Sequence, residues 1–228
     1  MWDEYELKMT FTTPLCGGVP RSEGIVQRWC QLRSASNAQL ARMQESSPVR
    51  TLEQVAEERL STIDPLPADT AEEIARVWVG FSRDEAGLFV RGGNIRAHFK
   101  DCAGTLGPIM KRGAVPGLVA MTAFKARATE ALYIREDRVH LKQDGQIVTE
   151  PTAHREATLS VMTPPGPRTA LKRVDYTFPC QLQSTILLLQ NGVINRDHLI
   201  ALLEYGKVHG FGQDRSLGYG KYEYELSD

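Results

Sequence analysis

Hydrophobic and polar residues alternate strictly at both ends of the chain. In the opening segment EYELKMTFTTP, Tyr5, Leu7, Met9 and Phe11 share one face, and charged or polar residues occupy the other. This period-two pattern is typical of a half-buried strand. The closing segment GKYEYEL (220–226) alternates in the same way. We therefore expect a strand at each end of the chain and expect the two strands to pair in one sheet.

Residues 20–82 differ from the rest in composition. They are rich in Ser, Gln, Arg, Glu and Ala and poor in β-branched residues, which predicts a mainly helical insertion in a single domain spanning 1–228. Within the insertion, Thr70 and Glu73 form a capping-box pattern, and apolar residues follow at helical spacing as far as Phe81. The spacing predicts a helix over 70–81.

A strand, a glycine turn and a helix are predicted in the middle of the chain. The apolar run GLFV (87–90) indicates a short strand that leads into RGGNIRAHFKDCAGTLG. In that segment Ile95, Phe99, Cys102 and Leu106 fall on one face of a helix.

The C-terminal half shows more strand and turn signals than helical ones. VHLKQDGQIV predicts a hairpin that turns at Asp144-Gly145, and TPPGP (163–167) predicts a turn or loop without regular structure. KRVDYTF and QLQSTILLLQ have the pattern of strands. Asn195 is placed to cap a helix that ends near Gly206, followed by a glycine-rich loop and the last strand.

These elements favour an α+β fold. Strands at both ends, with helices between them, fit a ferredoxin-like (RRM-like) antiparallel sheet that carries its helices on one face. A doubly wound parallel sheet is less favoured, because the chain lacks repeated strand-helix units.

Composition limits the class of protein. With 228 residues, of which 42% are hydrophobic, the chain can bury a core. Its formal net charge of -1 excludes a surface that is basic all over, so any nucleic-acid contact must be a local patch. Cys16, Cys30, Cys102 and Cys180 form no CxxC pair. We expect reduced thiols in a cytoplasmic protein, with no metal, no cofactor and no membrane contact.

Three glycine-containing segments carry the chemical information: TPLCGGVP (13–20), RGGNIRAHFK (91–100) and HGFGQDRSLGYGKY (209–222). Glycine tolerates positive φ and lets a backbone approach a ligand closely, and a helix N-terminus favours an anion. Each segment also has a simpler interpretation, because glycine turns and solvated charges are common at the ends of elements. His98 alone is interpreted as a surface or internally satisfied histidine.

Taken in order, the three segments resemble the RAMP superfamily of CRISPR-associated proteins, closest to the subunits that line up along a guide RNA. Those proteins share a threonine-proline-leucine and glycine turn after the first strand, a glycine entry to the first helix, and a glycine-rich loop before the last strand. This chain departs from their helix entry: Arg91-Gly92-Gly93-Asn94 replaces proline-glycine-serine-serine, and Arg96 replaces a lysine. The resemblance covers about 40 residues at both ends and in the middle.

The resemblance implies an RNA-binding subunit that contacts phosphates without reading sequence and assembles along the RNA with neighbouring copies or other subunits. The implied nucleic-acid contacts are Arg21, Arg91, Gly93, Asn94, Arg96, Lys100, Lys172, Arg173, Gly210, Gly212, Arg215 and Gly218.

Catalysis is less expected than binding. Some subunits of this kind cut RNA with an aspartate after the first strand, but this chain has no aspartate between Asp3 and Asp64. Glu23 and His209 are the weak catalytic candidates, and the activity in question is that of a metal-independent endoribonuclease. Two further interpretations stay open. One is a small-molecule or protein-binding ferredoxin-like domain, and the second is a phage or mobile-element protein that mimics a complex subunit.

Overall fold

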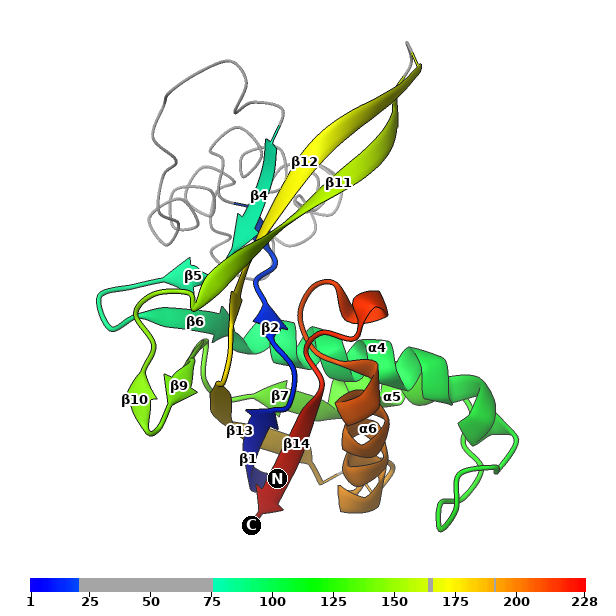
Figure 1. Cartoon of the computed structure of the whole chain (residues 1–228). Helices are drawn as coiled ribbons and strands as arrows, with labels where there is room; N and C mark the ends of the chain where they lie inside the picture. Colours follow the sequence, from blue (N-terminus) through cyan, green and yellow to red (C-terminus); the bar gives the residue numbers. More distant parts are fainter. Residues whose placement is uncertain (21–75, 164–165, 191) are drawn as a thin grey trace, which may run out of the picture. The chain divides into compact units, whose positions relative to one another are not determined.

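The computed structural model describes residues 1–20, 76–163, 166–190 and 192–228 (Figure 1). Contacts between Cα atoms divide the chain into two compact units. Unit 1 comprises 1–16, 85–153 and 176–228, and unit 2 comprises 17–84 and 154–175.

The sheet of unit 1 joins the two ends of the chain. Strand β1 (Trp2–Phe11) lies between β13 (Gln181–Leu189) and β14 (Tyr222–Ser227) and is antiparallel to both. Leu7 lies opposite Ser184 on one side and Leu226 on the other. The predicted pairing of the terminal strands is therefore confirmed.

Alternation along β1 places an apolar row on one face of this sheet. Tyr5, Leu7, Met9 and Phe11 are each no more than 9% exposed, while the charged side chains between them point to the other face. The alternation follows directly from the period-two geometry of a strand, as the sequence predicts.

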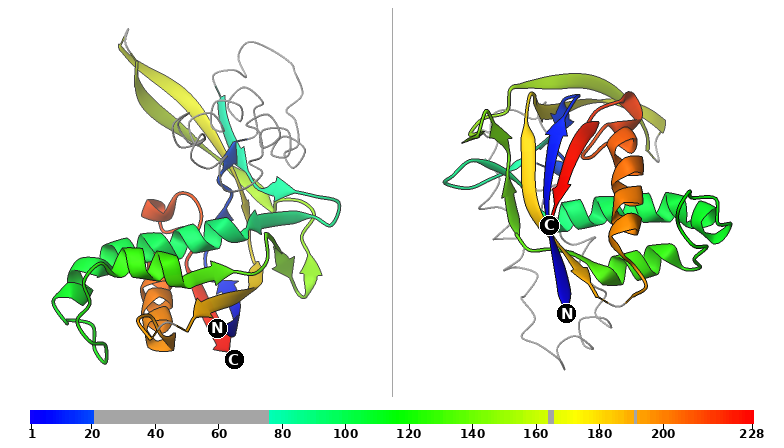
Figure 2. Two further views of the ribbon diagram at one scale, coloured as in Figure 1. Left: turned by 180° about the vertical axis from the view of Figure 1, so that it is seen from behind. Right: turned by 90° about the horizontal axis from the view of Figure 1, so that it is seen from below.

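Three helices belong to the described part of unit 1 (Figure 2): α4 (Gly92–Lys111), α5 (Phe124–Ala131) and α6 (Arg196–His209). Helix α4 packs against both other helices, and α6 also contacts β14. The predicted apolar face of α4 is confirmed, since Ile95, Phe99, Cys102 and Leu106 are buried. Helix α6 begins as predicted, because the Asn195 side chain accepts a hydrogen bond from the His198 amide.

Short strands complete unit 1. They are β2 (Leu15–Cys16), β6 (Leu88–Arg91), β7 (Leu132–Ile134), β8 (Arg138–His140), β9 (Lys142–Gln143) and β10 (Gln146–Ile147). Strands β9 and β10 form the predicted hairpin, in which Asp144 and Gly145 adopt φ of 49° and 80°. Strand β6 precedes α4 directly, as expected from GLFV.

Unit 2 contains β3 (Val19–Pro20), β4 (Arg76–Gly80), β5 (Ser82–Arg83) and most of a long hairpin, β11 (Ala153–Thr163) and β12 (Gly166–Thr177). Strand β4 runs parallel to β12 and antiparallel to β3. The sequence prediction of a loop over 163–167 is wrong at Thr163 and from Gly166 onward, where strands already run. Proline is tolerated at the start of a strand, and Pro167 is the second residue of β12.

The predicted helix over 70–81 is wrong in its described part. Residues 76–80 form strand β4, because the run Val77-Trp78-Val79 favours a pleated surface and pairs with Lys172 to Val174 of β12. Residues 70–75, with the capping-box pattern, lie outside the described residues, as does most of the predicted 20–82 insertion.

The fold class is thus mixed α+β with antiparallel strand pairing apart from the parallel β4–β12 pair, as predicted at the level of class. Among the described helices, none is long and apolar enough to cross a membrane.

Candidate nucleic-acid interface

The glycine loop, residues 210–220, folds back onto the end of the first strand. The Phe211 amide donates to the Gly220 carbonyl at 2.8 Å, and the Gly220 amide donates to the Pro14 carbonyl at 2.9 Å. The Gly210 amide donates to the Gly206 carbonyl and so extends the end of α6. These amides are satisfied within the protein and are not presented to a ligand, although the sequence alone suggests such a role for the loop.

Close packing explains Gly212 and Gly220 of this loop. Gly220 has φ of 72°, and a Cβ atom there would lie 1.8 Å from the Phe211 carbonyl oxygen. Gly212 has φ of 89°, and a Cβ atom would lie 2.7 Å from the Cys16 carbonyl oxygen. Only glycine fits such approaches. The structure therefore brings two of the three glycine segments, 13–20 and 209–222, into contact.

Arg215 reaches from the glycine loop to the middle of α4. Its Nη1 atom lies 2.6 Å from Asp101 Oδ2 and 2.7 Å from His209 Nε2. The hydrogen bond from Arg215 is the main cause that lowers the pKa of Asp101, with His209 adding to it. Asp101 therefore stays ionised at neutral pH and partly neutralises Arg215.

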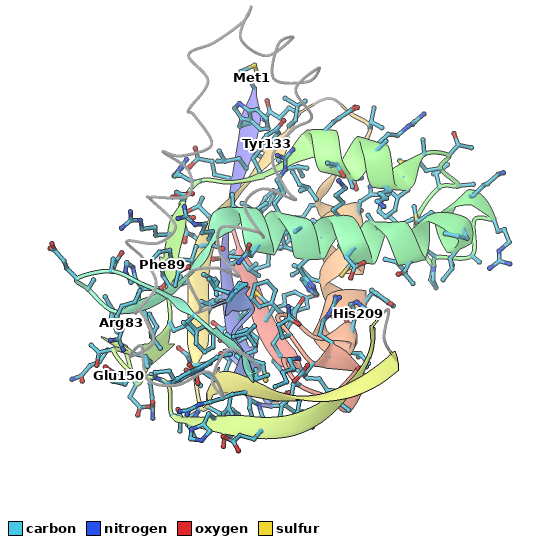
Figure 3. The ribbon with its side chains drawn as sticks, turned by 90° about the horizontal axis from the view of Figure 1, so that it is seen from above. Met1, Arg83, Phe89, Tyr133, Glu150 and His209 are labelled. Carbon is cyan, nitrogen blue, oxygen red and sulfur yellow. The ribbon has the colours of Figure 1, made fainter. Side chains whose placement is uncertain are left out.

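His209 and His98, unrelated by sequence spacing, lie together with their rings stacked 6.4 Å apart. His209, labelled in Figure 3 at the end of α6, places Nδ1 at 3.3 Å from the Tyr205 hydroxyl and Nε2 at 3.0 Å from Asp101 Oδ2. Both ring nitrogens of His209 are thus engaged.

His98 is a core histidine. It is 5% exposed, and its Nε2 atom lies 3.0 Å from the Tyr222 hydroxyl. Burial is the main cause that lowers the pKa of His98 to about 3, and the neighbouring His209 and Arg215 contribute to the shift. The ring is therefore neutral at physiological pH and joins α4 to the last strand.

Of the nucleic-acid contacts predicted at the start of α4, one is buried and two are exposed. Arg91 caps the helix, its side chain is 10% exposed, and Nη1 lies 3.3 Å from Asp137 Oδ2. Gly92 packs so closely that a Cβ atom would lie 2.0 Å from the Glu136 carbonyl oxygen. Gly93 and Asn94 in the first turn are exposed. Arg91 therefore holds the strand-helix junction, and the next turn faces solvent.

Arg96 and Lys100 also differ in environment. Arg96 is half-buried, donates to the Thr129 carbonyl of α5, and places its Cζ atom 4.1 Å from the centroid of the Tyr133 ring. Figure 3 labels Tyr133 beside α5. Arg96 thus braces α4 against α5 and β7. Lys100 is exposed.

On α4, α5 and the turn between them, exposed basic residues outnumber exposed acidic ones. Between residues 92 and 131 the sequence has six basic and two acidic residues, although the whole chain carries 27 basic and 28 acidic ones. We define the basic helical face by the exposed members of this set: Lys100, Lys111, Arg112, Lys125 and Arg127. The glycine segments do not reveal this face, but a charge count in a 40-residue window does.

The face of the unit 1 sheet that points away from the apolar row of β1 is acidic. We define the acidic sheet face by Glu4, Glu6, Glu136, Glu223 and Glu225. Glu4 pairs with Arg135, Lys8 lies 3.1 Å from Glu225, and Glu136 accepts a hydrogen bond from the Thr185 amide.

The remaining sequence candidates lie elsewhere. Lys172 and Arg173 are half-buried on β12, and the Arg173 Cζ atom lies 3.8 Å from the Trp78 ring centroid. Gly218 is in the glycine loop with open space around it. Arg21 and Glu23 lie outside the described residues. Within the described part of the chain, no group of three or more His, Cys, Asp or Glu side chains forms a metal site.

Comparison with known proteins finds similar chains in CRISPR complexes. No family model and no curated protein matches this chain. A chain in the structure of the type III-B Cmr-beta bound to cognate target RNA is 10% identical to this chain, with a TM-score of 0.44. The alignment covers 100% of this chain and 59% of the Cmr-beta chain. A chain of a type IV-B CRISPR complex is 8% identical, with a TM-score of 0.42. The alignment covers 99% of this chain and 90% of the type IV-B chain. At these TM-scores neither likeness carries an argument for function.

Proposed function

We propose that this chain is an RNA-binding subunit of a CRISPR-type ribonucleoprotein complex that contacts the phosphate backbone without reading sequence. The observation that carries the proposal is the basic helical face on a chain whose net charge is -1. A local excess of Lys and Arg is the electrostatic footprint of phosphate binding, because neutralised phosphates release counterions.

The surface of α4 supports close approach by a nucleic-acid backbone. Ala97 is exposed between Gly93 and Lys100, and a Cβ atom at Gly93 or Gly107 would find no neighbour within 4 Å. Because these residues are small, they do not block close approach to the helix backbone, and long basic side chains flank the same surface. A phosphate backbone can then lie along the helix and meet Lys100 and the basic side chains of α5.

Arg215 adds a charge that the glycine loop holds in place. Its side chain is 34% exposed and its Asp101 partner 48% exposed, so a phosphate can reach the pair from solvent. Exposed ion pairs are worth little, about 0–1 kcal/mol, and a phosphate oxygen is a competent replacement for the carboxylate. The loop's glycines therefore serve to position Arg215.

In this proposal the core is RRM-like but its open sheet face is not the RNA surface, since acidic side chains repel phosphates. That face is instead suited to a basic neighbouring subunit. Assembly along RNA, with copies of itself or other subunits, would leave the basic helical face on the RNA and the acidic sheet face available to a neighbour. A cytoplasmic setting suits the three described cysteines Cys16, Cys102 and Cys180, which are free and buried.

A binding role fits His209 better than catalysis does. A general base needs a ring nitrogen free to take a proton from the substrate, and both nitrogens of His209 already contact protein groups. His98 is buried and neutral with a pKa of about 3. Endoribonuclease activity would require both networks to open.

The test is purification of the full chain at low salt, followed by the 260/280 nm absorbance ratio and nuclease typing of extracted nucleic acid. RNA of defined length is the expected result. Anisotropy of labelled single-stranded RNA between 50 and 200 mM salt then gives the salt slope. Because each single-strand phosphate contact contributes about 0.7 to that slope, the variant Lys100→Gln/Lys125→Gln/Arg127→Gln should lower it by about 2.

Lys8→Gln on the acidic sheet face is the matched control and should leave the slope unchanged. A clean protein spectrum with no binding of RNA at micromolar protein would contradict the proposal and favour a subunit mimic or a protein-binding domain.

A further inference from the structure

In unit 2, three neighbouring side chains hold Arg173 in a fixed orientation. Trp78 of β4 lies opposite Arg173 of β12 in parallel register. The Trp78 Nε1 atom donates to Asp175 Oδ1 at 3.0 Å, and the Asp175 side chain is 4% exposed. The Arg173 Cζ atom lies 3.8 Å from the Trp78 ring centroid. The guanidinium is therefore stacked on an indole that a buried carboxylate anchors.

Arg173 has two further polar contacts. Its Nη2 atom lies 3.1 Å from His154 Nδ1, and its Nε atom lies 3.9 Å from Asp175 Oδ1. Guanidinium N–H bonds point outward in the plane of the group, so the hydrogen bond with His154 occupies neither face, and Asp175 is an ion-pair partner that receives no hydrogen bond from Nε. Trp78 covers one face. The Arg173 side chain is still 31% exposed, and we infer that the exposed part includes the face that lies away from Trp78.

We propose that the second face of Arg173 is a stacking site for an unpaired nucleobase. Arginine planes stack on bases, and single-stranded RNA offers bases with both faces available. Asp175 balances the charge of Arg173, which weakens its attraction for a phosphate but not its planar stacking. The exposed His154 ring borders the site. The proposal replaces the phosphate contact that the sequence suggests for Arg173.

This site adds base contacts to the proposed RNA-binding function, but its residues belong to unit 2, whereas the basic helical face belongs to unit 1. Its test can therefore be independent of RNA binding by that face. A mononucleotide carries the base and one phosphate, and ribose 5-phosphate carries the same phosphate without a base.

The experiment is saturation-transfer NMR on the full chain with adenosine 5′-monophosphate and with ribose 5-phosphate. We expect transfer to the adenine protons and little to ribose 5-phosphate. Arg173→Lys keeps the charge but removes the plane, and should lower affinity for the mononucleotide at least about fivefold, since stacking is worth about 1–3 kcal/mol per base. Lys8→Gln, which removes a lysine of unit 1, should leave the transfer unchanged.

Three results would overturn the stacking site: equal transfer to ribose 5-phosphate, unchanged transfer in Arg173→Lys, or transfer to N-acetyltyrosinamide but none to the mononucleotide. The last would assign the site to an aromatic side chain of a protein. The variant Lys100→Gln/Lys125→Gln/Arg127→Gln should keep the mononucleotide signal. A chain that binds no RNA yet shows Arg173-dependent transfer would refute the proposed function and retain the stacking site.

Discussion

The two outer surfaces of unit 1 carry opposite charge. The acidic sheet face presents glutamates from two strands and one connecting segment, and the basic helical face exposes lysines and arginines from α4, α5 and the turn after α4. Over the whole chain, basic and acidic residues nearly cancel. Net charge therefore hides the local charge differences, which are the property that affects association with charged partners.

One packed layer separates these two surfaces. His98 of α4 meets Tyr222 of β14, and Gly206 of α6 lies beside both. The layer joins the apolar face of the sheet to the helices that carry the basic residues. Surface substitutions can therefore test each face separately, and substitutions in this layer test the packing that joins the sheet to the helices.

Reversing charge on the basic helical face should have the largest effect. Lys100→Glu/Lys125→Glu/Arg127→Glu should weaken binding of single-stranded RNA by on the order of 100-fold at 100 mM salt, because three favourable phosphate contacts become repulsive. Anisotropy titration of labelled RNA measures the change.

The matched control reverses charge on the acidic sheet face. Glu223→Lys/Glu225→Lys should leave RNA affinity within about threefold of the wild type, apart from a general electrostatic gain. If that control changes affinity as much as the helical variant does, the difference between the faces has no functional meaning.

The second prediction concerns the layer between the faces. A Cβ atom at Gly206 would lie 2.4 Å from the Tyr222 hydroxyl oxygen and 2.8 Å from His98 Nε2. Gly206→Ala should therefore lower the free energy of unfolding by roughly 2 kcal/mol, the usual cost of overpacking. Urea unfolding followed by circular dichroism measures this.

Gly104→Ala, in the middle of α4, is the control, because a Cβ atom there would meet only the Lys125 side chain at an ordinary contact distance of 3.6 Å, and it should raise the free energy of unfolding by roughly 0.5–1 kcal/mol through helix propensity. A Gly206→Ala variant as stable as Gly104→Ala would show that the layer is loosely packed.

The sequence predicts this layer only in part. Alternation on β1 and helical spacing at Ile95 and Phe99 identify both sides of the core, because local periodicity records burial. The sequence assigns no partner to His98, since its contacts with Tyr222 and His209 join residues more than 100 positions apart. It also ends α6 near Gly206, whereas the helix continues to His209. That glycine makes room for a tyrosine from another element.

The errors in unit 2 have a similar origin. Val77 and Trp78 fit helical spacing as well as a short strand, and parallel pairing with β12 decides between the two. For the glycine loop, the sequence predicts positive φ but not its cause. The loop's amides bond to the 13–20 turn and within the loop, a contact between the two ends of the chain that no local pattern records.

The third prediction is an acid sensitivity that originates in the packed layer. The unfolded chain protonates His98 near pH 6.5, while burial lowers the pKa of the folded group to about 3. The stabilising contribution is therefore complete above pH 6.5 and is lost as pH falls toward 3, at up to roughly 1.4 kcal/mol per pH unit. His198, whose pKa is also lowered by burial, adds to the slope.

Urea unfolding at pH 7.5, 6.5 and 5.5 measures this dependence. His98→Gln cannot titrate and should show a shallower slope than the wild type, with only the remaining histidine contribution. Identical slopes for the two proteins would mean that the pKa of His98 is the same in the folded and the unfolded chain.

The smallest effect should come from Asp101, the acid that lies beside the basic helical face. Its hydrogen bond with Arg215 lowers the Asp101 pKa, so the carboxylate is ionised at neutral pH and competes with phosphate for the guanidinium. Asp101→Asn keeps a hydrogen-bond acceptor but removes the charge, and should raise RNA affinity about two- to fivefold at 100 mM salt. Arg215→Gln should lower affinity by a similar factor and reduce the salt slope by about 0.7. Opposite signs would establish Asp101 as a competitor for Arg215. A loss of affinity in both variants would instead mean that Asp101 holds Arg215 in its binding position, which makes the acid part of the RNA-binding surface.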